Sequence, residues 1–238
     1  RGGPPPAPRG TPGPRPPPRR RAGRGGPPAA LALTGTLALT ACGSGGDAGT
    51  GAATVRKESS SSAYQGSVLS KHFDKPDLVL TDTSGQPFDL RKQTAGHPTL
   101  LFFGYTSCPD VCPTTMGDIG VAMAKLPAEE QKKIDVVFVS TDPVRDTPKV
   151  LRTWLDSMGK GFIGLTGDLA KVKTAARPLG VVVQDPVVNP DGTVTSAHGA
   201  QVLAFLPQDD KAHLLYLGNS SVDTYAHDLA LFAKGVPA

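Results

Sequence analysis

Residues 97–115 read HPTLLFFGYTSCPDVCPTT, and this stretch decides the fold predicted for the chain. Its first part, at 97–105, is an apolar run of strand length, which predicts a strand buried on both faces of a sheet. Cys108 and Cys112 follow directly, ahead of a segment with helical spacing. Because open α/β sheets place their reactive groups at the carboxyl ends of strands, we expect the two cysteines to lie in a functional site.

Strand and helix patterns alternate along the neighbouring segments. Apolar spacing predicts a helix over 114–126, and the run IDVVFVST predicts a second buried strand over 134–141. Residues 146–159 predict a helix, with a capping residue, a proline in the first turn and a closing glycine. Two short apolar runs about a Ser-Gly turn predict a hairpin over 77–90. The other predicted elements are a helix near 168–178, strands over 201–207 and 213–218, and a terminal helix over 222–234.

This order of elements predicts a single α/β domain over residues 63–238. We expect a central mixed sheet flanked by helices, with an antiparallel edge and an N-terminal hairpin. A stretch of about 175 residues is long enough for one domain with its own core.

The basic charge of the chain comes from its first 30 residues. They hold seven arginines among prolines and glycines and no acidic residue. The whole chain carries a formal net charge of +4, so the remaining residues carry −3 once those seven charges are subtracted. A stretch of this composition cannot build a core, and the Lys/Arg excess gives no reason to expect nucleic-acid binding.

Residues 29–42, AALALTGTLALTAC, are typical of the apolar region of a signal peptide and are short for a bilayer span. They end in LTAC, which resembles a bacterial lipobox. The resemblance implies a lipoprotein-type signal peptide over 1–41 and a lipid on the sulfur of Cys42. The alternative is an ordinary signal peptide or an uncleaved anchor, with Cys42 incidental. The chain begins with Arg rather than Met, so its true start is left open.

Residues 42–62 are rich in Gly and Ser and show no apolar period, which predicts a flexible tether. A lipid and a tether together predict a domain held at the cell membrane, on the side facing away from the cytoplasm.

The pair Cys108 and Cys112 could be a structural disulfide, a redox couple or a metal clamp. The start of a helix favours an anion, so we expect a lowered thiol pKa and a pair that reacts or binds metal. A stabilising disulfide is disfavoured, because a loop closed by so few residues removes little entropy from the unfolded chain. The redox couple and the metal clamp both stay open.

Three motifs, in order along the chain, resemble one known family. They are GYTSCPDVCP at 104–113, STDPVRDTP at 140–148, and His198 ahead of the strand predicted at 201. On these motifs, the chain from about residue 64 to its end resembles the Sco (SCO1/SenC) proteins. The resemblance implies a thioredoxin-like fold, copper binding, and a part in assembling the dinuclear copper centre of cytochrome c oxidase.

The resemblance implies that Cys108, Cys112 and His198 are copper ligands. Two thiolates and one imidazole suit Cu(I), and with a further ligand or water they also accept Cu(II). The same cysteines can close a redox-active disulfide, so we expect the oxidised pair to release or refuse copper.

The surroundings of His198 are less well defined by the sequence. Members of the family often carry an acidic residue directly before the histidine, where this chain has Ala197. Asp110 and Asp142 are the candidates for holding the second ring nitrogen of His198. Asp142 and Asp146 also fit plain turn and helix-cap geometry. The other four histidines are expected to be surface or structural residues: His72, His97, His213 and His227.

The implied function is that of a membrane-tethered copper metallochaperone rather than an enzyme. Its expected partners are the copper-bearing subunit of cytochrome c oxidase and another copper donor protein. The alternative is a thiol-disulfide oxidoreductase that keeps the oxidase cysteines reduced, although such reductants usually carry CxxC. A peroxiredoxin-type peroxidase is excluded, because neither cysteine has Thr three and Pro seven residues before it.

Overall fold

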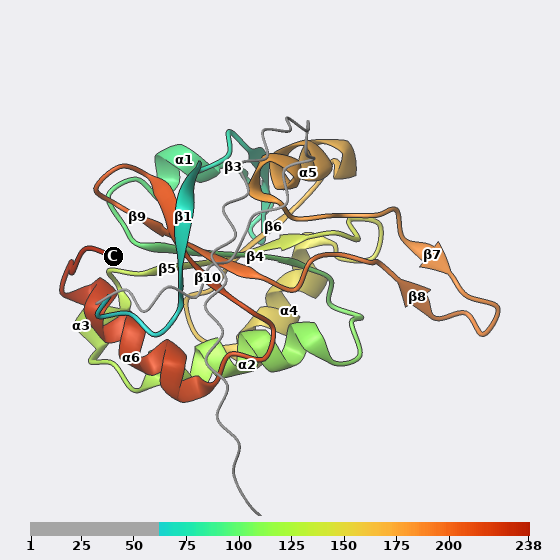
Figure 1. Cartoon of the computed structure of the whole chain (residues 1–238). Helices are drawn as coiled ribbons and strands as arrows, with labels where there is room; N and C mark the ends of the chain where they lie inside the picture. Colours follow the sequence, from blue (N-terminus) through green and yellow to red (C-terminus); the bar gives the residue numbers. More distant parts are fainter. Residues whose placement is uncertain (1–61) are drawn as a thin grey trace, which may run out of the picture. The chain divides into compact units, whose positions relative to one another are not determined.

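The structure is a computed structural model, and it describes residues 62–238 (Figure 1). The predicted signal segment 1–41, the lipidation site Cys42 and nearly all of the predicted tether 42–62 lie outside the described residues.

A mixed eight-stranded sheet forms the centre of the described part. Its strands are β1 (Ser67–Asp74), β2 (Val79–Asp82), β3 (Pro87–Asp89), β4 (Thr99–Gly104), β5 (Asp135–Ser140), β6 (Ile163–Thr166), β9 (Val202–Leu206) and β10 (Lys211–Tyr216). They lie in the order β1-β10-β9-β4-β5-β6-β2-β3. Strands β7 (Val187–Val188) and β8 (Val194–Thr195) form a separate hairpin that projects from the main sheet (Figure 1).

Strand β4 lies in the middle of the sheet, as its apolar sequence predicts. It pairs in parallel with β5 and antiparallel with β9, and all six of its residues are buried. Leu100 and Phe102 pack into one hydrophobic cluster, and Leu101 and Phe103 pack into another. Successive side chains of a strand point to opposite faces, so β4 separates two cores.

Helices cover both faces of the sheet (Figure 1). The first core receives side chains from α2 (Val111–Ala124), α4 (Pro148–Met158) and α6 (Val222–Ala233), and the second receives them from α1 (Leu90–Gln93) and α5 (Leu169–Ala176). A short helix α3 (Ala128–Gln131) leads into β5, and a 3₁₀ turn, Arg177–Leu179, follows α5. Within residues 62–238, no helix combines the length and the apolar character that crossing a bilayer requires.

The edges of the sheet differ in part from the prediction. The hairpin predicted over 77–90 forms as β2 and β3, and the predicted antiparallel pair forms as β9 and β10. Antiparallel strands flank the parallel centre on both sides, not on one. Strands β1 and β6 have no counterpart among the predicted elements, because β6 is four residues long with Gly164 inside it and β1 carries a mixed polar sequence. The β2–β3 hairpin is therefore not the first element of the fold.

Helix α2 begins at Val111, three residues before the predicted start at 114. Pro113 does not prevent this, because the first N–H groups of a helix have no partner within the helix. The earlier start places Cys112 within the first turn of α2.

Candidate metal centre

Cys108, Cys112 and His198 converge at the carboxyl end of β4. Cys108 lies in the loop after β4, Cys112 lies in the first turn of α2, and His198 lies in the segment between β8 and β9. One ligand atom from each residue lies within 4.8 Å of the other two. The fold thus brings together two cysteines and a histidine that stands 86 positions beyond Cys112 in the sequence.

The two sulfur atoms have different surroundings. Cys112 is fully buried, and its Sγ lies 3.4 Å from Nε2 of His198. Cys108 is half-buried, and its Sγ accepts a hydrogen bond of 3.5 Å from the backbone N–H of Cys112. Asp110, at the N-cap position of α2, makes no side-chain capping bond. The sulfur of Cys108 therefore accepts one of the N–H groups that are free at the helix start.

The expectation of a lowered thiol pKa is wrong for Cys112. Burial raises the pKa of the Cys112 thiol well above its usual value, because the charged form loses its hydration. Both cysteines are free thiols in the structure. A metal ion that binds here must therefore displace the proton of Cys112, so binding is linked to proton release.

The orientation of His198 is set by its own backbone neighbour. Nδ1 lies 2.9 Å from the carbonyl oxygen of Gly199. A carbonyl only accepts, so we assign the ring proton to Nδ1, which leaves the lone pair of Nε2 directed at Cys112. Burial lowers the pKa of the His198 ring, which favours this neutral form. The rings of Phe102 and Tyr105 meet His198 edge to face, with centroids 5.9 and 5.8 Å away.

Neither carboxylate proposed from the sequence holds the second nitrogen of His198. Asp142 pairs instead with the guanidinium of Arg145, and Asp110 is exposed at the N-cap of α2. The group that takes this role is the Gly199 carbonyl. A backbone carbonyl carries no signal in the sequence, because every residue has one.

Hydrogen bonds anchor the segment that carries His198. The buried Ser196 hydroxyl lies 2.8 Å from the hydroxyl of Thr141 and donates to the Thr141 carbonyl at 3.1 Å. The N–H of Thr141 donates in turn to the Gly104 carbonyl, at 2.7 Å. Because Gly104 ends β4, these bonds connect the histidine segment to the strand that precedes the cysteines.

Asp146 connects the cysteine loop to the end of β5. Its buried carboxylate accepts hydrogen bonds from the backbone N–H and hydroxyl of Thr106 and from the hydroxyl of Ser140. The helix-cap role considered for Asp146 belongs instead to Thr147, whose side chain accepts from Val150 N–H. Asp146 is therefore a positioning residue for the loop that carries Cys108.

Gly104 leaves room for the Cys112 sulfur. A Cβ atom at Gly104 would lie 2.9 Å from Sγ of Cys112 and 2.9 Å from the ring of Phe138. A glycine inside a strand often marks a close approach of this kind, and that signal could have identified Gly104 from the sequence.

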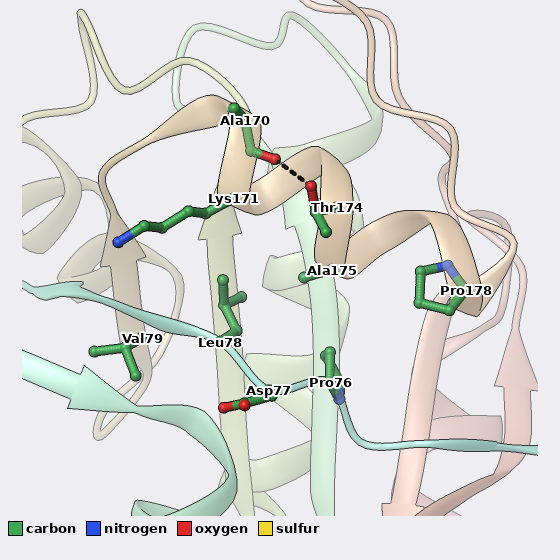
Figure 2. A pocket seen from close by; sticks show the side chains of 9 residues that line it. All are labelled: Pro76, Asp77, Leu78, Val79, Ala170, Lys171, Thr174, Ala175 and Pro178. Carbon is green, nitrogen blue, oxygen red and sulfur yellow. Dashed lines mark hydrogen bonds between the residues drawn. The ribbon is translucent and has the colours of Figure 1, made fainter.

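A hollow of about 620 Å³ lies away from these ligands, between α5 and the segment that enters β2 (Figure 2). It offers neither cysteine nor histidine, and its lining is mostly aliphatic: Pro76, Asp77, Leu78, Val79, Ala170, Lys171, Thr174, Ala175 and Pro178. The hollow therefore does not serve as the metal centre.

The fold defines a thioredoxin-like α/β protein, in which two cysteines and a histidine lie close enough to bind one metal ion. Residues 69–234 match the SCO1/SenC family, and the chain belongs to that family. The predicted family and fold class are thus confirmed.

Three relatives illustrate the similarity. Protein SCO2, mitochondrial, of Saccharomyces cerevisiae is 36% identical over 107 residues, which cover 45% of this chain and 35% of that one. The structure of Bradyrhizobium japonicum ScoI with copper bound matches with a TM-score of 0.57 and 30% identity, over 68% of this chain and 98% of that one. Apo Sco1 from Thermus thermophilus matches with a TM-score of 0.60 and 32% identity, over 70% and 95%. The matches span between 35% and 61% of the length of the first curated relatives.

Proposed function

We propose that this protein is a copper metallochaperone that carries one copper ion on Cys108, Cys112 and His198. The convergence of two sulfurs and one imidazole nitrogen within 4.8 Å is the observation that carries the proposal. Thiolates favour Cu(I) over the harder ions that carboxylates and water select, and imidazole also suits copper. The lone pair of Nε2 is already directed into the site, so the histidine needs no rearrangement to bind.

The exposure of the ligands favours a carrier over a permanent copper site. Cys112 is fully buried, whereas Cys108 is only half-buried. An acceptor thiolate would therefore reach the ion from the side of Cys108. Three protein ligands also leave Cu(II) a position for water or a further ligand, so both oxidation states fit.

We further propose that copper is delivered to the copper-bearing subunit of cytochrome c oxidase and received from another copper donor protein. In this proposal, residues 1–41 are a signal peptide, Cys42 carries a lipid, and residues 42–62 tether the domain outside the cytoplasm. Membrane fractionation tests the anchor: Cys42→Ser should move the protein into the soluble fraction. A variant that stays with the membrane contradicts the lipid anchor and leaves copper binding untouched.

Copper titration of the reduced protein against a chromophoric Cu(I) chelator tests the copper site. We expect one tightly bound Cu(I) in the native chain and loss of tight binding in Cys108→Ser and Cys112→Ala. His198→Ala should lower the affinity by at least about tenfold, and Cys42→Ser, the matched control, should leave it unchanged. Unchanged copper stoichiometry and affinity in the Cys108→Ser/Cys112→Ala variant would contradict the copper proposal.

A thiol-disulfide oxidoreductase is the second candidate, because two free thiols lie close together at a helix start. The raised pKa of the Cys112 thiol counts against Cys112 as the attacking nucleophile, since the thiolate is the reactive form. Turnover of a model protein disulfide separates the two candidates. Catalytic turnover by the metal-free protein, lost in Cys108→Ser, would favour the reductase.

A further inference from the structure

A second group of metal-ligand side chains lies at the β1 edge of the sheet. His72 comes from β1, His213 from β10, and Asp209 from the turn between β9 and β10. One ligand atom from each of the three residues lies within 4.8 Å of the other two. The two imidazole rings face each other, with centroids 3.7 Å apart and planes inclined by 39°. None of these residues belongs to the centre formed by the cysteines and His198.

Irregular strand pairing brings the two histidines together. Val68 lies opposite Leu214 and Phe73 lies opposite Ala212, so residues 69–72 of β1 face His213 alone. His213 is also the extra residue of β10 against β9, where the register shifts between 212 and 214. Bulges re-aim side chains and often occur beside functional sites.

The bulge also sets the position of His213 between the two cores. Ala212 and Leu214 pack into hydrophobic clusters on opposite faces of the sheet, although residues two apart in a regular strand share a face. His213 is the residue between them, and its side chain keeps 15% of its exposure. It is therefore held at a fixed place and keeps partial access to solvent.

The carboxylate of Asp209 is fixed beside the ring of His213. Both of its oxygens lie 3.0 Å from Nε2 of His213, and one of them accepts the backbone N–H of Lys211 at 3.1 Å. The side chain of Lys211 turns to Asp74, with Nζ 3.4 Å from the carboxylate, so its positive charge is offset. A pair of Asp209 and His213 would suffice to stabilise the turn, but it leaves the close approach of the His72 ring unexplained.

We propose that His72, Asp209 and His213 bind a divalent transition-metal ion through two imidazole nitrogens and one carboxylate oxygen. A set of nitrogen and oxygen ligands without sulfur selects divalent ions, Cu(II) above Zn(II) and Ni(II), and does not select Cu(I). Three protein ligands leave a coordination position for water or for an exchanging ligand. This site differs in ligands and in metal preference from the proposed copper site. Because the two sites share no residue, the proposal does not depend on the proposed copper site.

Cu(II) titration of the full chain carrying Cys42→Ser, Cys108→Ser and Cys112→Ala tests the proposal, because this background holds no sulfur ligand from cysteine. We expect one bound Cu(II) per chain, with hyperfine coupling to two imidazole nitrogens in the electron paramagnetic resonance spectrum. Adding His72→Ala or Asp209→Asn should lower the affinity by at least about tenfold. Calorimetric titration of the same variants with Zn(II) should rank their affinities in the same order.

His97→Ala is the matched control. His97 also lies beside a carboxylate, that of Asp135, but it belongs to neither group of three metal-ligand side chains among the described residues. It should bind Cu(II) as the background does. His72 is exposed, so its replacement leaves the fold intact even if a change at the bulge residue His213 does not. Equal affinity in the background and in His72→Ala, or no stoichiometric Cu(II) binding in the background, would overturn the proposal.

Discussion

Replacing Gly104 by alanine should disturb the candidate metal centre without replacing any of its three proposed ligands. Gly104 ends β4, and its backbone conformation is open to any residue, so the effect comes from the added methyl group alone. That methyl group would lie 2.9 Å from Sγ of Cys112 and 2.9 Å from the ring of Phe138, where ordinary contacts begin at 3.4 Å. Both neighbours are fully buried, so neither can move aside freely.

The size of the effect follows from these distances. A gap of 2.9 Å must widen by about 0.5 Å, and overpacking of this kind in a core typically costs about 1–3 kcal/mol of stability. A metal site tolerates shifts of about 0.2 Å in its ligand distances, so displacing the Cys112 sulfur by more should lower the Cu(I) affinity. We expect a loss of about 10–100-fold, similar to that caused by removing a group that orients a ligand.

Urea unfolding of the metal-free protein and competition for Cu(I) with a chelator measure the two effects separately. Gly117→Ala is the matched control, because Gly117 lies in α2 and a Cβ atom there meets nothing within 4 Å. The control should bind copper normally and gain up to about 1 kcal/mol from its better helix propensity. Native stability and native affinity in Gly104→Ala would refute the claim that this glycine makes room for the sulfur.

The remaining predictions concern the groups that position the ligands. Asp146→Ala should cost about 2–4 kcal/mol in urea unfolding, because it leaves the buried hydroxyl of Ser140 and the N–H and hydroxyl of the half-buried Thr106 without their acceptor. Asp156→Ala on the exposed face of α4 should cost little. Ser196→Ala should lower copper affinity without changing the stoichiometry, because it loosens the segment carrying His198; an unchanged affinity would contradict this anchor. Burial lowers the pKa of His198 in the folded protein, so this histidine is protonated at a higher pH in the unfolded chain than in the folded one. Below about pH 6.5 the unfolded state therefore binds more protons, and the metal-free protein should lose stability on acidification. The free energy of unfolding, measured at about pH 7.5 and at about pH 5, should fall less in His198→Gln than in the native chain. Equal falls in the two proteins would argue against a buried neutral ring.

The sequence carries strong signals for the centre of the fold and weak ones for its edges. The runs at 97–105 and 134–141 are apolar throughout because β4 and β5 are buried on both faces, so the strands could be predicted with little ambiguity. The sequence of strand β1 gives no clear strand signal, because its bulge at residues 69–72 interrupts the alternation of apolar and polar residues. The apolar spacing begins at 114, so it does not reveal that helix α2 starts three residues earlier, where Pro113 fits within the first turn.

The residues of the candidate site likewise differ in how strongly the sequence signals them. Cys108 and Cys112 are close in sequence and directly follow a buried strand, so their position predicts a functional site. His198 was found only through the resemblance to a family, because no local pattern connects it to residues 86 positions away. The Gly199 carbonyl could not be predicted, since it acts through the backbone. The link from Asp146 to Thr106 spans 40 positions and depends on where β4 and β5 end relative to each other.

X-ray absorption at the copper edge of the Cu(I)-loaded protein tests the central claim most directly, because it counts the atoms bound to the ion. The claim predicts two sulfur neighbours and one imidazole nitrogen, with the nitrogen lost in His198→Ala and one sulfur lost in Cys108→Ser. A first shell of nitrogen and oxygen alone, or a spectrum that these substitutions leave unchanged, would contradict it.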